Sequence, residues 1–222
     1  MAAEQLQTVM VAADDREQAL SLAGDSVSRE TIARLDRFAE LLTERQKTLN
    51  LIARSTLPLL WTRHIADSLQ LLEHARTART WLDLGSGAGF PGLVVAIGGE
   101  GRGMTVDLVE SNARKCAFLR HVVRLTGAAA GVHQTRLETV IPSFVGKVDV
   151  VSARALAPLR DLLAWTEPLL TTGTTGLFPK GRDAAAELTE AEKLWRFDVA
   201  ILPSRTAPEA RILRIAHLES RR

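Results

Sequence analysis

A short segment near residue 85 constrains the fold more than any other part of the chain. It reads Trp-Leu-Asp-Leu-Gly-Ser-Gly-Ala-Gly-Phe-Pro-Gly from Trp81 to Gly92. The apolar run predicts a strand that ends at Asp83, the glycines predict a tight turn, and Pro91 marks the start of a helix. This order is typical of an open α/β sheet, in which ligands lie at the carboxyl ends of the strands.

Short apolar runs alternate with amphipathic segments from residue 80 onward. Strands are predicted at 80–84, 105–109, 131–135, 148–151, 175–178, 197–202 and 211–218, and helices at 91–98, 112–126, 158–170 and 183–193. This alternation predicts a mostly parallel sheet with right-handed crossovers, and the last two strands form a hairpin that adds one antiparallel strand. We therefore expect a Rossmann-like α/β domain over residues 80–222, with a seven-stranded sheet.

The first 79 residues are predicted to be helical. Residues 1–27 are expected to form a lead-in that is frayed or only briefly helical. A long helix is predicted from Ser28, and a second helix is predicted to be capped by Ser55 and to carry Leu59 inward. Residues 28–79 are thus expected to form a helical cap segment ahead of the α/β domain.

Composition limits the environment more than the activity. The net charge is +2 with a pI of about 9.0, which permits an RNA partner without requiring one. The single cysteine, Cys116, cannot form an internal disulfide and is expected to pack in the core. We find no apolar run of membrane-spanning length and no metal-ligand pattern, and we expect a cytoplasmic monomer that does not bind a membrane.

The glycine turn could bind either of two nucleotide-type cofactors. Gly87 to Gly92 formally matches the dinucleotide pattern G-x-G-x-x-G, which alone is a weak signal. NAD would place an anionic pyrophosphate beside Asp83, whereas S-adenosylmethionine would place an ammonium and a sulfonium there. The acid attracts these cations and repels a phosphate, so Asp83 with Gly85, Gly87 and Gly89 favours S-adenosylmethionine. A structural turn with no ligand is the less favoured alternative.

Two more strand ends are candidates for contacts with the cofactor. Glu110 follows the second strand, where a carboxylate can accept both ribose hydroxyls of an adenosine; a solvated charge that opens the next helix is the alternative. Leu137 and Glu138 follow the third strand, over which the adenine would lie. Arg154 and Lys180 follow the fourth and fifth strands and are interpreted as facing the same cleft.

The ordered motifs of the chain resemble the glucose-inhibited division protein B family (RsmG), the bacterial methyltransferases of small-subunit ribosomal RNA. The resemblance covers roughly residues 28–217. It rests on these segments, in chain order: Asn50-Leu51, Arg63-His64-Ile65-Ala66-Asp67-Ser68-Leu69, Asp83 to Gly92, Lys115 with Phe118-Leu119, Ser152 with Arg154-Ala155, and Lys180-Gly181. The Arg63 segment is the specific part, since the glycine turn alone fits any Rossmann-like methyltransferase.

The resemblance implies transfer of a methyl group from S-adenosylmethionine to N7 of one guanine in 16S ribosomal RNA. It also implies two sets of site residues. Those expected to line the cofactor site are Gly85, Phe90, Leu137, Glu138 and Arg154, and those expected to face the RNA or the target base are Asn50, Arg63, His64, Lys180 and Arg211. The ribosomal subunit itself is an alternative form of the RNA partner.

The implied chemistry requires no acid or base. Guanine N7 has an exposed lone pair and no proton to lose, so His64 is not assigned as a general base. Without the resemblance, a structural hydrogen bond between His64 and Asp67 would be the simpler reading, because the two are three apart on a predicted helix. Three other functions stay open: a methyltransferase with a small-molecule or protein acceptor, an NAD-dependent oxidoreductase, and a non-enzymatic RNA-binding module.

Overall fold

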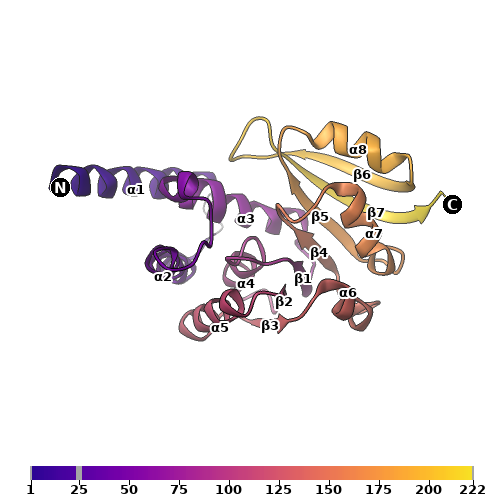
Figure 1. Cartoon of the computed structure of the whole chain (residues 1–222), viewed down its shortest axis with the longest axis horizontal. Coiled ribbons are helices and arrows are strands. Elements are labelled where there is room, and N and C mark those ends of the chain that lie inside the picture. The colour runs from indigo at the N-terminus through magenta and orange to yellow at the C-terminus, as the bar shows by residue number, and fades with distance from the viewer. Residues whose placement is uncertain (1, 24–26, 222) are drawn as a thin grey trace.

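Seven strands form one sheet, in the order β3-β2-β1-β4-β5-β7-β6, in the computed structural model of the chain (Figure 1). The structure describes residues 2–23 and 27–221, with side chains from residue 13 onward. The strands are β1 Thr80–Leu84, β2 Thr105–Glu110, β3 Ala130–Gln134, β4 Val150–Ala153, β5 Thr175–Lys180, β6 Trp195–Pro203 and β7 Arg211–Ser220. Every strand predicted from the sequence is present, with ends shifted by a few residues.

The direction of the strands matches the sequence prediction. β1 pairs in parallel with β2 and β4, β3 pairs in parallel with β2, and β5 pairs in parallel with β4. β7 runs antiparallel to both of its neighbours, β5 and β6. The expected sheet with one antiparallel strand is confirmed. The chain reverses its direction of winding between the neighbouring strands β1 and β4, and such a switch point opens a crevice at the strand ends.

Helices cover both faces of the sheet because side chains alternate along each strand. Trp81, Val106 and Leu108 belong to a core that includes the helices α4 and α5, whereas Leu82 and Val109 belong to a second core that includes α7. All five side chains are almost fully buried. The helices of the α/β region are α4 Gly92–Gly98, α5 Ala113–Thr126, α6 Leu137–Val140, η5 Ile141–Phe144, α7 Leu159–Leu170 and α8 Ala184–Glu192.

The helical segment packs onto the sheet through α2, which spans Arg29–Gln46. The helix predicted from Ser28 is present, and Ser28 is its N-cap, whose side chain accepts a hydrogen bond from the Thr31 N–H. The buried Phe38 ring of α2 lies 5.3 Å from the ring of Phe90 and 6.4 Å from that of Phe118. Because Phe90 follows the glycine turn, this aromatic cluster ties the helical segment to the turn itself.

The lead-in is more ordered than the sequence suggested. Helix α1 spans Ala2–Ala23 and lies along the helical segment (Figure 1). Its Asp15 carboxylate is buried and accepts the N–H groups of Trp61 and Thr62, at 2.8 and 3.1 Å. Arg16 pairs with Asp36 at 2.7 Å and stacks on the Trp61 ring. The lead-in is helical, as one of the two expected alternatives held, but at 22 residues it is longer than expected. The contacts that hold it lie 20 to 47 residues away in sequence, so no local pattern marks them.

The second predicted helix begins differently from the expectation. The segment from residue 54 to 74 is a series of tight and wide turns, η2 Arg54–Leu59, η3 Trp61–Ala66, α3 Asp67–Leu69 and η4 Gln70–His74. Ser55 lies inside η2 and is not the N-cap, and Leu59 is 46% exposed. Both expectations fail because η2 is a 3₁₀ turn, whose three residues per turn rotate side chains away from an α-helical pattern.

None of the helices in the described part of the chain combines the length and apolar character of a membrane span.

We expect Asp15→Ala to destabilise the fold. The substitution leaves the buried N–H of Trp61 and the partly buried N–H of Thr62 without their acceptor, which costs about 1–3 kcal/mol. Urea unfolding should show this loss, and the exposed neighbour Asp14→Ala should stay within about 0.5 kcal/mol of the parent. Equal unfolding midpoints for the two variants would contradict the capping role.

Candidate active site

The turn between β1 and α4 contains three glycines in the left-handed region. Gly85, Gly87 and Gly89 have φ of 66°, 55° and 107°, which residues with a Cβ rarely adopt. A Cβ added at Gly87 would meet only the carbonyl oxygen of Gly85 within 4 Å, at 3.7 Å. The backbone at Gly87 is therefore open, and a ligand can approach it closely.

Glu110 holds the glycine turn from the end of β2. One carboxylate oxygen accepts the Gly87 N–H at 3.0 Å and the other accepts the Asn112 N–H at 2.7 Å. Each oxygen can accept a second hydrogen bond, so both remain able to bind a hydroxyl. Glu110 is therefore chemically suited to the predicted ribose contact, and it also braces the turn.

Asp83 lies beneath the glycine turn, not on its surface. It is fully buried, and its Oδ1 accepts the Ser152 hydroxyl at 2.7 Å, while Oδ2 has no hydrogen-bond partner among the described residues. A Cβ on Gly92 would lie 2.5 Å from the Asp83 Cβ, so only glycine lets α4 pass this close. Burial raises the pKa of Asp83 to about 6, because it disfavours the charged form.

The largely buried guanidinium of Arg154, with 18% of its side chain exposed, joins the helical segment to the end of β4. Arg154 donates to His64 Nδ1 at 2.6 Å, to the Arg63 carbonyl at 3.1 Å and to Asp67 Oδ2 at 3.4 Å. Its guanidinium carbon lies 5.2 Å from the centre of the Phe90 ring. Four separate contacts fix this arginine at the mouth of the glycine turn.

His64 is held in one neutral form by its neighbours. Because arginine only donates, Nδ1 of His64 must accept, and the proton resides on Nε2, which lies 2.9 Å from Thr56 Oγ1. Burial and the charges of Arg154 and Arg63 lower the pKa of His64 to about 3. The alternative hydrogen bond between His64 and Asp67 is absent among the described contacts, since Asp67 bonds Arg154, Gln70 and Thr206 instead.

These groups line one cleft of about 740 Å³, within the range of small-molecule sites. Its walls come from the glycine turn, the end of β4, the η2 and η3 turns, and the loop between β6 and β7. The predicted site residues on this wall are Arg63, His64, Gly85, Gly87, Phe90, Arg154, Lys180 and Arg211. The fold thus brings together predicted site residues from five separate segments of the chain.

Six predicted residues are absent from the described lining of the cleft: Asn50, Asp83, Gly89, Glu110, Leu137 and Glu138. Asp83 and Glu110 act on the turn from below and beside it. Asn50 lies in an adjoining hollow formed by residues 50–54. Leu137 packs against the second core at the start of α6. The predicted contact of Asn50 with RNA rests on the family resemblance, and the contacts of the other five residues with the cofactor stay predictions.

Two of the predicted RNA-facing cations already have partners within the protein. The Lys180 ammonium lies 2.7 Å from Glu187 Oε2 and donates to the Ala157 carbonyl, with 8% of its side chain exposed. Arg211 donates to the carbonyls of Pro208 and Ala210. Arg63 is exposed, and its side chain has no hydrogen bond or ion pair with the other described residues. Arg63 is therefore the most accessible cation of the three.

Two residues that the sequence did not single out hold the partners of Arg154 in place. Thr56 bonds the His64 ring, and Thr206, in the loop between β6 and β7, donates to Asp67 at 2.8 Å. Thr206 is separated from Asp67 by 139 residues, and threonine is a common residue, so no local pattern marks it.

Comparison with known proteins assigns the chain to a family. A model described as rRNA small subunit methyltransferase G matches residues 31–211. A relative with the name ribosomal RNA small subunit methyltransferase G, from Methylobacterium radiotolerans, is 59% identical over 92% of this chain and 96% of its own. The chain belongs to the rRNA small subunit methyltransferase G family.

A more distant member of the rRNA small subunit methyltransferase G family, from Nitrobacter hamburgensis, is 48% identical over 98% of this chain and 83% of its own. Solved structures share the fold at low identity. An O-methyltransferase from Bacillus cereus in complex with SAH has a TM-score of 0.56 at 12% identity, covering 81% of this chain and 90% of that one. A mutant of MtNAS in complex with S-adenosylmethionine has a TM-score of 0.55 at 18% identity, covering 82% and 74%. The predicted Rossmann-like fold is confirmed.

We expect Asp83→Asn to change how the stability of this family member depends on pH. The folded pKa of about 6 exceeds the unfolded value of 3.8, so the native state binds more protons between these values. The contribution of Asp83 to stability is therefore complete below pH 3.8 and lost as the pH rises through 6. Relative to the parent, Asp83→Asn should gain about 2–3 kcal/mol between about pH 4 and 7.

Urea unfolding across this pH range measures the difference between the two proteins, in which the low pKa of His64 cancels because both contain it. Asp14→Asn, on the exposed side of α1, is the control and should show a constant difference. A constant difference for Asp83→Asn as well would show that the Asp83 carboxyl titrates normally.

Proposed function

We propose that this protein transfers a methyl group from S-adenosylmethionine to N7 of a guanine in small-subunit ribosomal RNA. The observation that carries the proposal is near full-length identity of 59% to a relative with that methyltransferase name, in a chain whose glycine turn opens into a cleft. The RNA partner and the target atom come from the family. The structure contributes the arrangement of the residues that would serve them.

The cleft fits the cofactor in shape and in chemistry. The open backbone at Gly87 leaves room beside the turn, and both Glu110 oxygens retain acceptor capacity for ribose hydroxyls. The buried Asp83 carboxylate below the turn places negative charge near a site that would hold cations. When bound, S-adenosylmethionine supplies a methyl group attached to a positively charged sulfur.

The residues at the cleft are arranged for alignment and not for proton transfer. Both nitrogens of His64 are already hydrogen-bonded, and its pKa of about 3 keeps the ring neutral, so it is not free to take a proton at neutral pH. Guanine N7 has no proton to lose, and this reaction requires none. Phe90 and the Arg154 cluster instead form a rigid wall that fixes the base and excludes water.

Arg63 is the proposed contact for the RNA backbone. Its exposed guanidinium lies on the cleft wall, one residue from His64, and guanidinium groups bind phosphate in a bidentate manner. Lys115, at the start of α5, also lines this cleft. The two cations border the opening through which an extruded nucleotide would enter.

Methyl incorporation tests the proposed reaction. Purified protein with labelled S-adenosylmethionine should methylate small ribosomal subunits lacking the modification, and reverse-transcription mapping should locate N7-methylguanine at one position. Gly85→Ala should abolish incorporation, because a Cβ at φ 66° is strained and would lie 2.6 Å from Leu156. Label in a protein or small acceptor, or stabilisation by NAD but not by S-adenosylhomocysteine, would contradict the proposal.

Two arginine variants should separate alignment from RNA binding. Arg154→Lys keeps the charge but cannot reproduce the fork of contacts to His64 and Asp67, so kcat should fall by about tenfold or more with little change in the Kd for RNA. Arg63→Gln should raise the KM for RNA and make RNA binding less dependent on salt, with kcat retained.

Methylation kinetics and RNA binding at several salt concentrations measure both effects. Arg45→Gln, an exposed arginine on α2 outside the cleft, is the control and should match the parent. An unchanged kcat for Arg154→Lys would show that the cluster around Arg154 only supports the fold.

A further inference from the structure

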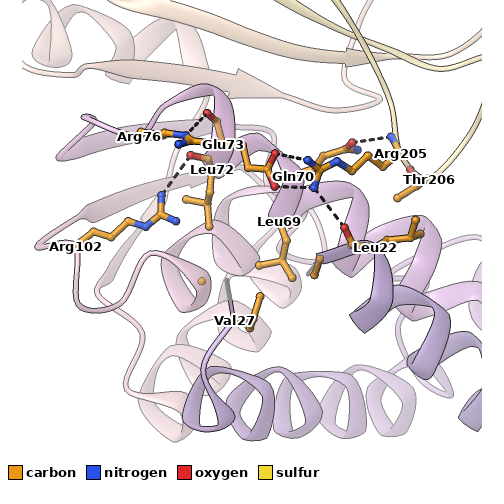
Figure 2. Close-up of a pocket in the computed structure, with 13 residues that line it drawn as sticks. Leu22, Val27, Leu69, Gln70, Leu72, Glu73, Arg76, Arg102, Arg205 and Thr206 are labelled. Carbon is orange, nitrogen blue, oxygen red and sulfur yellow. Dashed lines mark hydrogen bonds and ion pairs between the residues drawn. The ribbon is translucent and has the colours of Figure 1, made fainter. Parts of the chain in front are cut away.

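A second cavity lies behind the cofactor cleft and has no role in the proposed reaction. It has a volume of about 510 Å³ and lies between the end of α1, the turns at 66–76, the end of α4, and the loop between β6 and β7 (Figure 2). Thr206 lines both this cavity and the cofactor cleft. Asp67, which lines the cleft, accepts hydrogen bonds at Oδ1 from both Gln70 and Thr206, which line the second cavity, so this group separates the two spaces.

The interior of the second cavity is apolar. Leu22, Val27, Leu69 and Leu72 contribute side chains to its walls (Figure 2). Gly98 lies beneath the two central leucines, and a Cβ there would be 2.6 Å from Leu69. The floor is thus tightly packed, and the space above it is a cavity with a defined base.

The polar groups in this cavity are occupied by the protein itself. The Gln70 amide donates to Asp67 and Ser204 and accepts the Arg205 N–H. Both oxygens of Glu73 accept from the Arg205 guanidinium at 2.6 Å. These bonds leave the amide donors and the carboxylate engaged, so the interior favours a ligand body without hydrogen-bonding groups.

The rim has an excess of positive charge. Arg76 and Arg102 each donate to a backbone carbonyl, of Glu73 and Leu72 respectively, and neither has a carboxylate partner among the described residues (Figure 2). Among the described residues that line the cavity, the guanidinium groups of Arg76, Arg102 and Arg205 outnumber the single carboxylate, that of Glu73. Guanidinium groups with free donors at the mouth of an apolar cavity attract an anion.

We propose that the second cavity binds a small amphipathic anion, with its alkyl or aryl body against Leu69 and Leu72 and its carboxylate, sulfonate or phosphate group at Arg76 and Arg102. The class follows from the two halves of the cavity. The polar groups inside already have hydrogen-bond partners, and Arg76 and Arg102 at the rim have no carboxylate partner among the described residues. A nucleotide fits less well, because its base would lose hydrogen bonds in the apolar interior.

Displacement of a fluorescent probe tests the proposed class. The probe is anilinonaphthalene sulfonate, which has an aryl body and an anionic group, with the full-length protein and with S-adenosylhomocysteine present to fill the cofactor cleft. Decanoate below its micelle concentration should displace the probe, and decanol should do so about tenfold less well because it lacks the charge. Butyrate and AMP should not displace it.

Two kinds of variant locate the binding. Arg76→Gln combined with Arg102→Gln should lower the affinity for decanoate about tenfold and leave the affinity for decanol unchanged. Arg45→Gln should leave both affinities unchanged. Leu22→Trp should fill the cavity and abolish binding, with a melting temperature near that of the parent as evidence of folding. All variants should retain affinity for S-adenosylhomocysteine.

Three results would overturn the proposal: no displacement by millimolar decanoate, equal displacement by decanol and decanoate, or AMP binding that depends on Arg76 and Arg102. Probe displacement requires no methyl transfer, so it tests the second cavity separately from the proposed reaction. Failure of the methylation assay alone would leave this binding result intact.

Discussion

The site depends on the contacts of the largely buried Arg154 guanidinium. It joins the end of β4 to the η3 turn through His64, Asp67 and the Arg63 carbonyl, and it stacks on Phe90 beyond the glycine turn. A buried cation is costly unless its donors are matched, and here both the carboxylate of Asp67 and the ring of His64 meet it. The helical segment and the sheet therefore share one rigid edge of the cleft.

The three acidic side chains near the cleft have different structural roles. Asp67 compensates the charge of Arg154, Glu110 braces the glycine turn by accepting the Gly87 N–H, and Asp83 lies beneath the turn with Ser152. Glu110 thus fixes the backbone of the turn and Asp67 fixes the position of a cation, in addition to any attraction these carboxylates have for a ligand. In a reaction that needs alignment and no proton transfer, such fixed geometry is the main contribution a protein can make.

Much of the fold follows from local pattern. Short apolar runs identified all seven strands, and the alternation of such runs with amphipathic segments from residue 80 marked the start of the sheet. The pattern failed where the backbone leaves the α-helical period. Leu59 points to solvent because η2 is a 3₁₀ turn, and α1 is ordered because Asp15 caps a turn 46 residues away. Neither the 3₁₀ turn at Leu59 nor the cap formed by Asp15 has a signature in the adjacent sequence.

The sequence by itself determined the glycine turn, its acidic neighbours and the identity of the residues that meet at the strand ends. It could do so because the alternation of side chains along a strand and the conformational freedom of glycine are local properties, which depend only on adjacent residues. Only the tertiary structure decided which of these residues face the cleft, that His64 is neutral with both nitrogens bonded, and that Lys180 is neutralised by Glu187. Those facts depend on burial and on partners distant in sequence, which set the charge and orientation of a side chain.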